Sequence, residues 1–351
     1  MEKHNLLLPV ILFLIFISCS GLNSENAHEP SIWLNQTEID DLPTQGESFE
    51  YVVNFANSGL KANLFDQDND HNNQTYAQAL LCARDVDQVY CDMAIQGIID
   101  AMHTQGEAHM LALGRNLAAY VIAADLTGYR DPQFIKWLDE IRHKEISGRT
   151  LISTHERRPN NHGTVAGASR IAASAFLGDE SDVASAAQIF HDWLGNREVY
   201  TDFVFGGPDG ILDWQANPDK PVGINPPGST KEGHNIDGVL PDEMRRCGDG
   251  SFKWPPCRTG YNWGGMQGAV LQAELLHRQG YPAWEWESKA LLRAASWLYN
   301  ATADDGDTYY PRIEMRWQPW LINKTYDTNF KTERATPPGK NMGFTDWTHG
   351  L

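Results

Sequence analysis

The sequence predicts an all-α fold, an incomplete (α/α) toroid (an α/α barrel) with a long irregular loop region lining the cleft. Apolar residues recur at helical spacing from about residue 75 to 194 and again from 262 to 300, in segments of similar length separated by short turns. Between these stretches, residues 195–260 are rich in Gly and Pro and show no helical period. So long an irregular segment in a compact domain is usually functional, and we expect it to line a binding cleft.

Eight helices are expected in chain order, each placed by the spacing of its apolar residues. Gly128 is a stop signal for the third helix, and Gly178-Asp179 is a short turn between two helices that should pack as an antiparallel pair. The expected bounds are 76–86, 92–102, 107–127, 132–146, 162–177, 181–194, 262–279 and 285–300. The last fifty residues are aromatic and show no such period.

The N-terminus is typical of an export signal over residues 1–19. Lys3 precedes an apolar run over residues 6–17 that is too short to span a bilayer comfortably. The run ends in Ile-Ser-Cys-Ser, which resembles a bacterial lipoprotein cleavage box and would make Cys19 the lipidated first residue. An ordinary secretory signal cut shortly after Ser20 is the alternative. In both cases we expect an exported protein, either a periplasmic or outer-membrane-anchored lipoprotein or a secreted one.

The rest of the chain is expected to form a tether and one large domain. Residues 20–60 are polar and irregular, which is typical of a tether, and residues 61–351 would form the toroid domain. With 351 residues and 41% hydrophobic content, the chain can bury a sizeable core. No later run is long and apolar enough for a membrane span, so membrane contact is expected only through a lipid on Cys19.

The cysteines fit export into an oxidising compartment. Apart from Cys19, the chain has an even set, Cys82, Cys91, Cys247 and Cys257. Three pairings are possible, and the two local ones, Cys82 with Cys91 and Cys247 with Cys257, would close short loops. Neither local pair has the spacing of a metal site, and no metal is expected.

The net charge of −18 argues against nucleic acid as a partner, because nothing in the chain resembles a basic stripe. An acidic substrate would need a locally basic cleft in this acidic protein. Cations do concentrate between residues 142 and 162, although a solvated helix face with a loop would give the same pattern. The twelve Trp and twelve Tyr residues suit carbohydrate stacking as well as core packing, and both interpretations stay open for Trp214, Trp254 and Trp263.

Asn160-Asn161-His162 is the first candidate for a functional site. Pro159 disfavours helix in the residue before it, so a helix is expected to begin here with Asn160 as its N-cap. Asn161 and His162 would then lie in the first turn, where free backbone N–H groups and the helix dipole favour an anion. The plainer interpretation is that Asn160 only caps the helix and His162 is a satisfied polar residue.

A second set of residues follows inside and just after the loop region. Gly238-Val-Leu-Pro-Asp-Glu243 leads to Arg246, and Tyr261 opens the next helix. In this order the three parts resemble the helical alginate-lyase superfamily of polysaccharide lyases, which carries Asn-Asn-His at a helix start, then Gly-x-Leu-Pro-x-Glu followed by Arg, then Tyr at a helix start. The stretch from Gly233 to Pro241 and the closing Gly-Lys-Asn-Met-Gly-Phe-Thr-Asp-Trp-Thr are similar to the branch that cleaves glucuronan or mannuronan.

The resemblance implies a role for each matching residue. Asn161 and His162 would neutralise a substrate carboxylate, Tyr261 would be the acid/base, and Arg246 would be the family arginine beside it. A disulfide-sized insertion separates Arg246 from Tyr261, so Arg258 is a rival for the arginine role. We expect substrate contacts from Asn160, His234, Arg258, Trp263 and Trp214 as well.

The chemistry explains why these residue types are needed. Eliminative cleavage removes the C5 proton of a uronic acid and expels the oxygen at C4, and the charge that develops spreads into the carboxylate. Donors placed on that carboxylate in advance stabilise the charge. A tyrosine has a reference pKa near 10, so it acts as a base only where a neighbouring cation lowers that pKa.

The stereochemistry narrows the substrate. In β-D-mannuronate and β-D-glucuronate the C5 proton and the C4 oxygen lie on the same face, so one tyrosine could serve both. Their C5 epimers would need a separate base, for which His162 or His234 could serve. We therefore expect a polysaccharide lyase that cleaves a β-1,4-linked glucuronan or polymannuronate to 4,5-unsaturated ends, without a metal or organic cofactor.

Two alternatives of other kinds remain at this point. A glycoside hydrolase on a similar toroid would need two carboxylates, and Asp237, Asp242 and Glu243 are present. A glycan-binding lipoprotein would use the aromatic residues without turnover. Arg246 would in these cases only pair with Glu243 or Asp242, and Tyr261 would only pack at its helix start.

Overall fold

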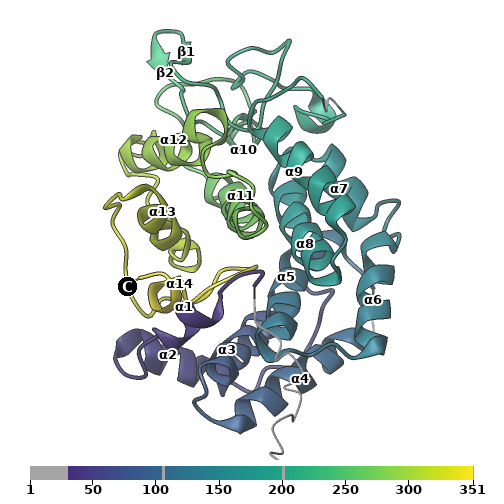
Figure 1. Cartoon of the computed structure of the whole chain (residues 1–351). Helices are drawn as coiled ribbons and strands as arrows, with labels where there is room; N and C mark the ends of the chain where they lie inside the picture. The colour runs from purple at the N-terminus through teal and green to yellow at the C-terminus, as the bar shows by residue number, and fades with distance from the viewer. Residues whose placement is uncertain (1–30, 105–106, 200–201, 351) are drawn as a thin grey trace, which may run out of the picture.

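The computed structural model describes residues 31–104, 107–199 and 202–350, and these residues are mostly helical (Figure 1). The expected export signal and Cys19 lie outside the described residues. Within the described ranges there are fourteen α-helices and one pair of two-residue strands. None of the described helices is long and apolar enough to cross a membrane.

The helices follow one another around a curved arrangement, from α2 and α3 through α5 and α8 to α11 and α13 (Figure 1). The first seven are α1 (Gln36–Asp40), α2 (Glu47–Ala56), α3 (His71–Ala83), α4 (Gln88–Met102), α5 (Met110–Thr127), α6 (Pro132–His143) and α7 (Leu151–Arg157). The others are α8 (Asn161–Leu177), α9 (Glu180–Leu194), α10 (Pro241–Met244), α11 (Tyr261–Arg278), α12 (Trp286–Asn300), α13 (Gln318–Tyr326) and α14 (Thr345–Thr348). Strands β1 (Thr230–Lys231) and β2 (His234–Asn235) form an antiparallel pair.

All eight helices predicted from periodicity are present, with shifted ends. The largest shift is in α3, which begins at His71 rather than at residue 76. Its first turns are polar but buried, and the Asn73 side chain donates a hydrogen bond to the carbonyl of Gly339 at 2.7 Å. Long-range contacts of this kind leave no apolar period, which is why the pattern missed the start. Helix α13 shows that the last fifty residues are not wholly irregular.

Residues 31–60, which the sequence predicts to belong to an irregular polar tether, are instead helical in part and joined to the core. Trp33 and Leu34 are fully buried, and Trp33 Nε1 donates to the Tyr76 hydroxyl at 2.8 Å. The backbone N–H groups of Ser31 and Ile32 donate to Asp125 in α5. A few well-placed anchors thus hold a segment whose average composition is polar.

Four long helices, α3, α5, α8 and α11, form the inside of the molecule, and each packs against the next. They are buried on nearly all sides, as expected for helices without a polar face. Glycines allow the close approach: a Cβ at Gly114 of α5 would lie 3.1 Å from the Ala166 backbone nitrogen in α8. A Cβ at Gly268 of α11 would lie 2.4 Å from the Thr164 carbonyl carbon, so α8 is held tightly between two neighbours.

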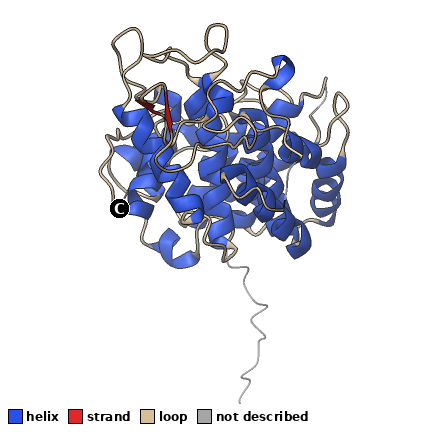
Figure 2. Ribbon diagram, turned by 90° about the horizontal axis from the view of Figure 1, so that it is seen from above, coloured by secondary structure: helices blue, strands red, loops and turns tan. Residues whose placement is uncertain are grey.

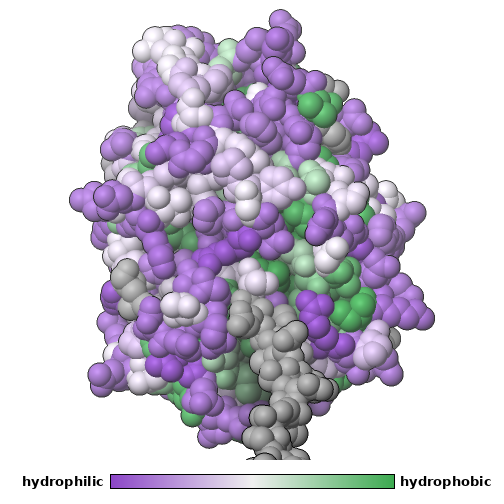
Figure 3. Space-filling view, viewed as in Figure 1, coloured by the Kyte–Doolittle hydropathy of each residue, from purple (hydrophilic) through white to green (hydrophobic). Residues whose placement is uncertain are grey.

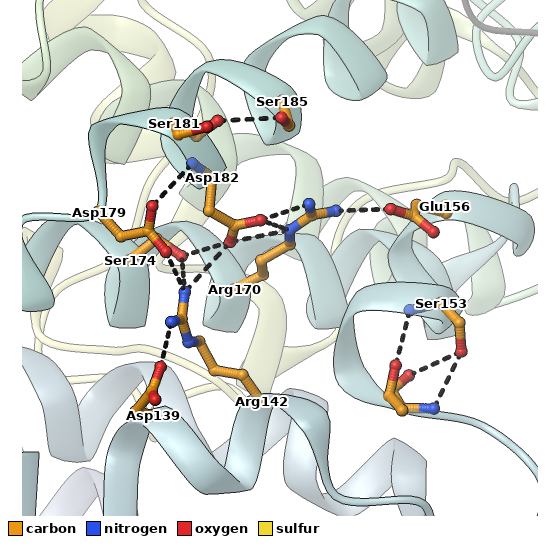
Figure 4. A network of polar contacts seen from close by, with 11 residues as sticks. Asp139, Arg142, Ser153, Glu156, Arg170, Ser174, Asp179, Ser181, Asp182 and Ser185 are labelled. Carbon is orange, nitrogen blue, oxygen red and sulfur yellow. Dashed lines mark hydrogen bonds and ion pairs between the residues drawn. The ribbon is translucent and has the colours of Figure 1, made fainter. Parts of the chain in front are cut away.

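A buried ionic network fixes α8 to the outer helices (Figure 4). Arg170 of α8 donates to Asp182 of α9, with a shortest distance of 2.6 Å, and contacts Glu156 of α7 at 3.4 Å. Arg142 of α6 contacts Asp179 and Asp182, at 3.1 and 3.4 Å. Arg142 is one of the cations that made residues 142–162 look like a basic region, and its charge is compensated here.

The loops and the small strand pair lie mostly toward one edge of the helical layer (Figure 2). Both local disulfide pairings are confirmed: Cys82 is bonded to Cys91, and Cys247 is bonded to Cys257. The second bond closes the insertion between Arg246 and Tyr261. The face of the molecule shown in Figure 3 is largely hydrophilic, with scattered apolar areas, in keeping with the high charge of the chain.

Candidate active site

The turn into α8 is fixed from several sides. Asn160 is the N-cap, as predicted, and its side-chain oxygen accepts a hydrogen bond from the His162 backbone N–H at 3.2 Å. Trp193 Nε1 donates to the carbonyl of Pro159 at 2.7 Å. Gly163 has no room for a side chain, because a Cβ there would lie 1.6 Å from the Arg158 carbonyl oxygen. The helix start is therefore rigid, and its first backbone N–H groups all have acceptors: Glu243 for Asn161, the Asn160 side chain for His162, and the Asn160 carbonyl for the next two residues. The backbone N–H groups that the sequence predicts to be free for an anion are thus already engaged.

Glu243 joins the two halves of the predicted site. This carboxylate accepts the backbone N–H of Asn161 on one oxygen and Arg246 Nη1 on the other, the latter at 3.2 Å. Only 2% of Glu243 is exposed, and burial raises the pKa of its carboxyl to about 7 against the lowering effect of Arg246. The charge of Glu243 and the position of Arg246 are thus coupled.

Arg246, not Arg258, lies beside Tyr261. The Arg246 guanidinium carbon is 3.4 Å from the centroid of the Tyr261 ring, in a cation–π contact. Tyr261 is the first residue of α11 and is 42% exposed, so the residue is accessible to a ligand. Arg258 instead pairs with Asp305 at 2.9 Å and Asp307 at 2.5 Å.

Arg246 also orients Asn161. Its Nη1 donates to Asn161 Oδ1 at 2.8 Å, which turns the amide oxygen toward the arginine and leaves Nδ2 as the outward donor. None of the described residues accepts a hydrogen bond from Asn161 Nδ2. Asn161, Arg246 and Tyr261 thus form one contiguous set, although Tyr261 is 100 positions from Asn161 in the chain.

His162 lies in a strongly positive environment and is uncharged at neutral pH. Burial, together with Arg158, Arg246 and Arg115, lowers the pKa of the imidazole to about 4. None of the described residues hydrogen-bonds to its ring. It can therefore donate one N–H to a ligand or accept a proton, but it brings no positive charge of its own.

Arg115 and Arg158 are functional candidates that the sequence analysis did not single out. Burial lowers the pKa of both guanidinium groups, and the nearby positive charge of Arg246 acts in the same direction. Arg158 has no ion pair or hydrogen bond to its guanidinium among the described residues, and the buried Nε of Arg115 is likewise unpartnered. The sequence did carry one signal: Arg115 is the only Asp, Glu, Lys or Arg between residues 108 and 124.

Apart from Asn160, the residues predicted to bind substrate make their contacts away from Asn161, Arg246 and Tyr261. Trp214 and Trp263 are each 3% exposed, and Trp263 Nε1 donates to the Tyr309 carbonyl at 2.5 Å, so both rings favour the core-packing interpretation. His234 stacks on Trp254, with ring centroids 4.5 Å apart. Arg258 is held by the two aspartates described above. Asn160 caps α8 and in this way fixes the position of the helix start that carries Asn161 and His162.

The described residues contain no group of three or more His, Cys, Asp or Glu side chains arranged to hold a metal ion. The side chains gathered at the site carry amide, imidazole, guanidinium, phenol and carboxyl groups, from Asn161, His162, Arg246, Tyr261 and Glu243. Together these groups can bind an anion and move a proton.

Part of the chain is similar to a family of polysaccharide lyases, and this similarity identifies the protein as an enzyme, a polysaccharide lyase. The matching family model is described as alginate lyase and covers residues 64–202, which includes Asn161 and His162 but ends before Arg246 and Tyr261. The match does not distinguish one branch of the family from another. No curated protein matches the chain.

Proposed function

We propose that this enzyme cleaves a β-1,4-linked uronan, either glucuronan or polymannuronate (alginate), by β-elimination and leaves 4,5-unsaturated uronate ends. The observation that carries the proposal is the position of Arg246, which contacts both the Asn161 amide and the Tyr261 ring. A carboxylate-binding group and a proton-transfer group are thus held side by side by one cation.

The substrate carboxylate would bind at the start of α8. Asn161 Nδ2 and the His162 ring supply hydrogen bonds, while Arg115, Arg158 and Arg246 supply positive charge. These groups are fixed before substrate arrives, so they stabilise the negative charge that spreads into the carboxylate as the C5 proton leaves. This refines the role predicted for His162: it acts as a neutral donor, and the arginines neutralise the charge.

Tyr261 would transfer the proton. In glucuronate and mannuronate the C5 proton and the C4 oxygen share a face, so one phenolate oxygen can take the C5 proton. The resulting phenol then gives its proton to the leaving C4 oxygen and returns to phenolate. Arg246 supplies positive charge beside the ring on which negative charge appears when the phenolic proton departs. For the C5 epimers a second base would be required on the opposite face, and neutral His162 is the available group.

The carboxylates that a hydrolase would require are engaged elsewhere. Asp237 pairs with Arg293 at 2.5 Å and accepts the Gly228 N–H. Asp242 is buried, pairs with Arg245 and accepts the Gly206 N–H. Glu243 is held by Asn161 and Arg246. These engagements favour elimination over hydrolysis, which needs a free acid and a second free carboxylate.

Two broader expectations belong to the same proposal. The packing of α3, α5, α8 and α11 inside flanking outer helices supports an incomplete (α/α) toroid, with the residue 195–260 loops over its cleft. The export signal predicted from the sequence and the two disulfide bonds support a protein exported from the cytoplasm, with or without a lipid on Cys19.

The test is to incubate the protein with glucuronan, polymannuronate and polyguluronate and to follow the ultraviolet absorbance of the unsaturated product. We expect product from at least one of the first two. Tyr261→Phe should abolish turnover without loss of fold, whereas Tyr281→Phe, just beyond the opposite end of α11, should leave it intact. Saturated products would instead indicate hydrolysis, and binding without product on every polymer would indicate a non-catalytic glycan-binding protein.

A further inference from the structure

Two adjacent cavities lie next to the start of α11. The first, with a volume of about 480 Å³, is lined by Thr259, Gly260 and Trp263, which flank Tyr261 in the chain. The second, of about 490 Å³, is lined mainly by residues of the 299–331 segment and is called the outer cavity. Arg258, Tyr310 and Arg312 line both cavities, so the two share a wall, and the first is lined by the residue that directly precedes Tyr261.

The outer cavity is rich in cations. Four of its lining residues are basic, namely Arg258, Arg312, Arg316 and Lys331, and one, Asp307, is acidic. Arg258 is compensated by Asp305 and Asp307, and Arg316 is paired with Glu333. Lys331 lies 3.8 Å from that same glutamate. Arg312 has neither an ion pair nor a side-chain hydrogen bond to any of the described residues.

The position of Arg312 relative to the active site is set by Gly260. A Cβ at Gly260 would lie 3.1 Å from the Arg312 guanidinium carbon and 3.2 Å from its Nε. The arginine therefore packs directly on the residue that precedes Tyr261. It lies at the boundary of the two cavities, with its charge uncompensated.

We propose that Arg312, assisted by Lys331, forms a flanking subsite that binds the carboxylate of a second uronate residue of the polymer while Tyr261 acts on the first. The inference rests on the function proposed above. A uronan carries one carboxylate per sugar, so a chain held at Tyr261 presents further carboxylates along any cleft that continues from it. Arg312 is an exposed cation without an ion pair among the described residues, and it packs on Gly260 next to Tyr261, so it meets that requirement.

Tyr310 has a structural role in this subsite. Its ring contacts the Arg316 guanidinium at 4.9 Å and the Lys331 ammonium at 4.6 Å, and its hydroxyl contacts Glu333. The ring is thus occupied by cations and forms a wall of the cavity. We therefore assign recognition in this subsite to charge, with no stacking of a sugar on Tyr310.

The experiment compares wild type, Arg312→Ala, Arg312→Lys and Lys331→Ala on glucuronan and polymannuronate. For Arg312→Ala we expect KM for the polymer to rise about fivefold, the effect of one partly solvated charge pair. The rise should be smaller on the shortest oligouronate that is cleaved, should shrink with added salt, and should be largely reversed in Arg312→Lys. Lys136→Ala on α6, a 76%-exposed cation remote in sequence, is the matched control.

A polymer KM for Arg312→Ala and Lys331→Ala equal to that of the control would overturn the subsite. Binding of uncleaved polymer to the Tyr261→Phe protein, with and without Arg312→Ala, gives a second measurement that does not depend on turnover. If the wild type produces no unsaturated ends, the proposed function fails; the subsite then still stands or falls on whether Arg312→Ala weakens polymer binding.

Discussion

Glu243→Gln is the most informative single change, because Glu243 holds both Asn161 and Arg246. Its two oxygens accept one N–H from each, and glutamine has the same shape but only one acceptor. The amide NH2 of the glutamine would face one of the two donors, so one charge-assisted hydrogen bond is lost, with a contribution of about 1.5–3 kcal/mol. We expect Arg246 to move away from the Tyr261 ring and kcat/KM to fall about a hundredfold, as is common for small displacements of positioning groups.

The same change should affect stability much less than activity. Burial raises the pKa of Glu243 from its ordinary 4.5 to about 7, which corresponds to about 3 kcal/mol against the ionised form. The folded protein therefore holds this proton more tightly than the unfolded chain, and stability falls as the pH rises from about 4.5 to 7. Glutamine does not ionise, so the variant is spared this loss of stability at neutral pH. The spared stability offsets the contribution of the lost hydrogen bond.

Two measurements check the Glu243 prediction. Thermal unfolding between pH 5 and 8 should show a stability decline with rising pH in wild type that is weaker in Glu243→Gln. The kcat/KM profile of wild type should rise through about pH 7 as Glu243 ionises, and the variant should lack that step. Glu140→Gln, an exposed glutamate on α6, is the control. A Glu243→Gln enzyme with the wild-type rate and pH profile would refute the coupling of Glu243 to the site.

Two further predictions concern His162 and the packing of α8 against α11. The pKa of His162 is lowered from 6.5 to about 4, so the stability that its neutral form contributes is complete above pH 6.5 and is lost as the pH falls through 4. In urea unfolding, His162→Gln should therefore lose less stability than wild type as the pH is lowered over this range. Gly268→Ala should lower stability by at least about 1–3 kcal/mol, because its Cβ would meet the Thr164 backbone at 2.4 Å. Gly264→Ala, on the same helix with nothing within 4 Å of its Cβ, should leave the melting temperature unchanged or raise it.

Periodicity predicted the long helices well, because each buries a regular apolar set. It failed where burial depends on distant partners. In the polar first turn of α3, the buried Asn73 side chain donates to the Gly339 carbonyl of the C-terminal segment, and the buried Trp33 donates its N–H to Tyr76. The short helices α1 and α7 each bury a single apolar residue, Ile39 and Leu151, so no pattern over a window of that length could reveal them.

The same distinction holds for the site, where some residues could be predicted from local sequence and others depend on distant contacts. Local signals were enough for the Asn160 cap, since a proline and an amide before an apolar period fix a helix start. The choice between Arg246 and Arg258 could not be made from spacing, because a disulfide-closed insertion lies between Arg246 and Tyr261. Arg115 comes from a different helix, and only the packing of α5 on α8 brings it near His162.

The unpaired cations give a physical reason for substrate selection. The chain carries a net charge of −18, yet Arg115 and Arg158 lie partly buried near Arg246, and Glu243 is the one described carboxylate that contacts Arg246. The lowered pKa values of Arg115 and Arg158 reflect the cost of burying these charges close together. A uronate carboxylate would relieve that cost, whereas a neutral sugar would cover the cations without pairing them. The site should therefore reject neutral glycans through uncompensated charge, in the way a polar site rejects analogues that leave its groups unpaired.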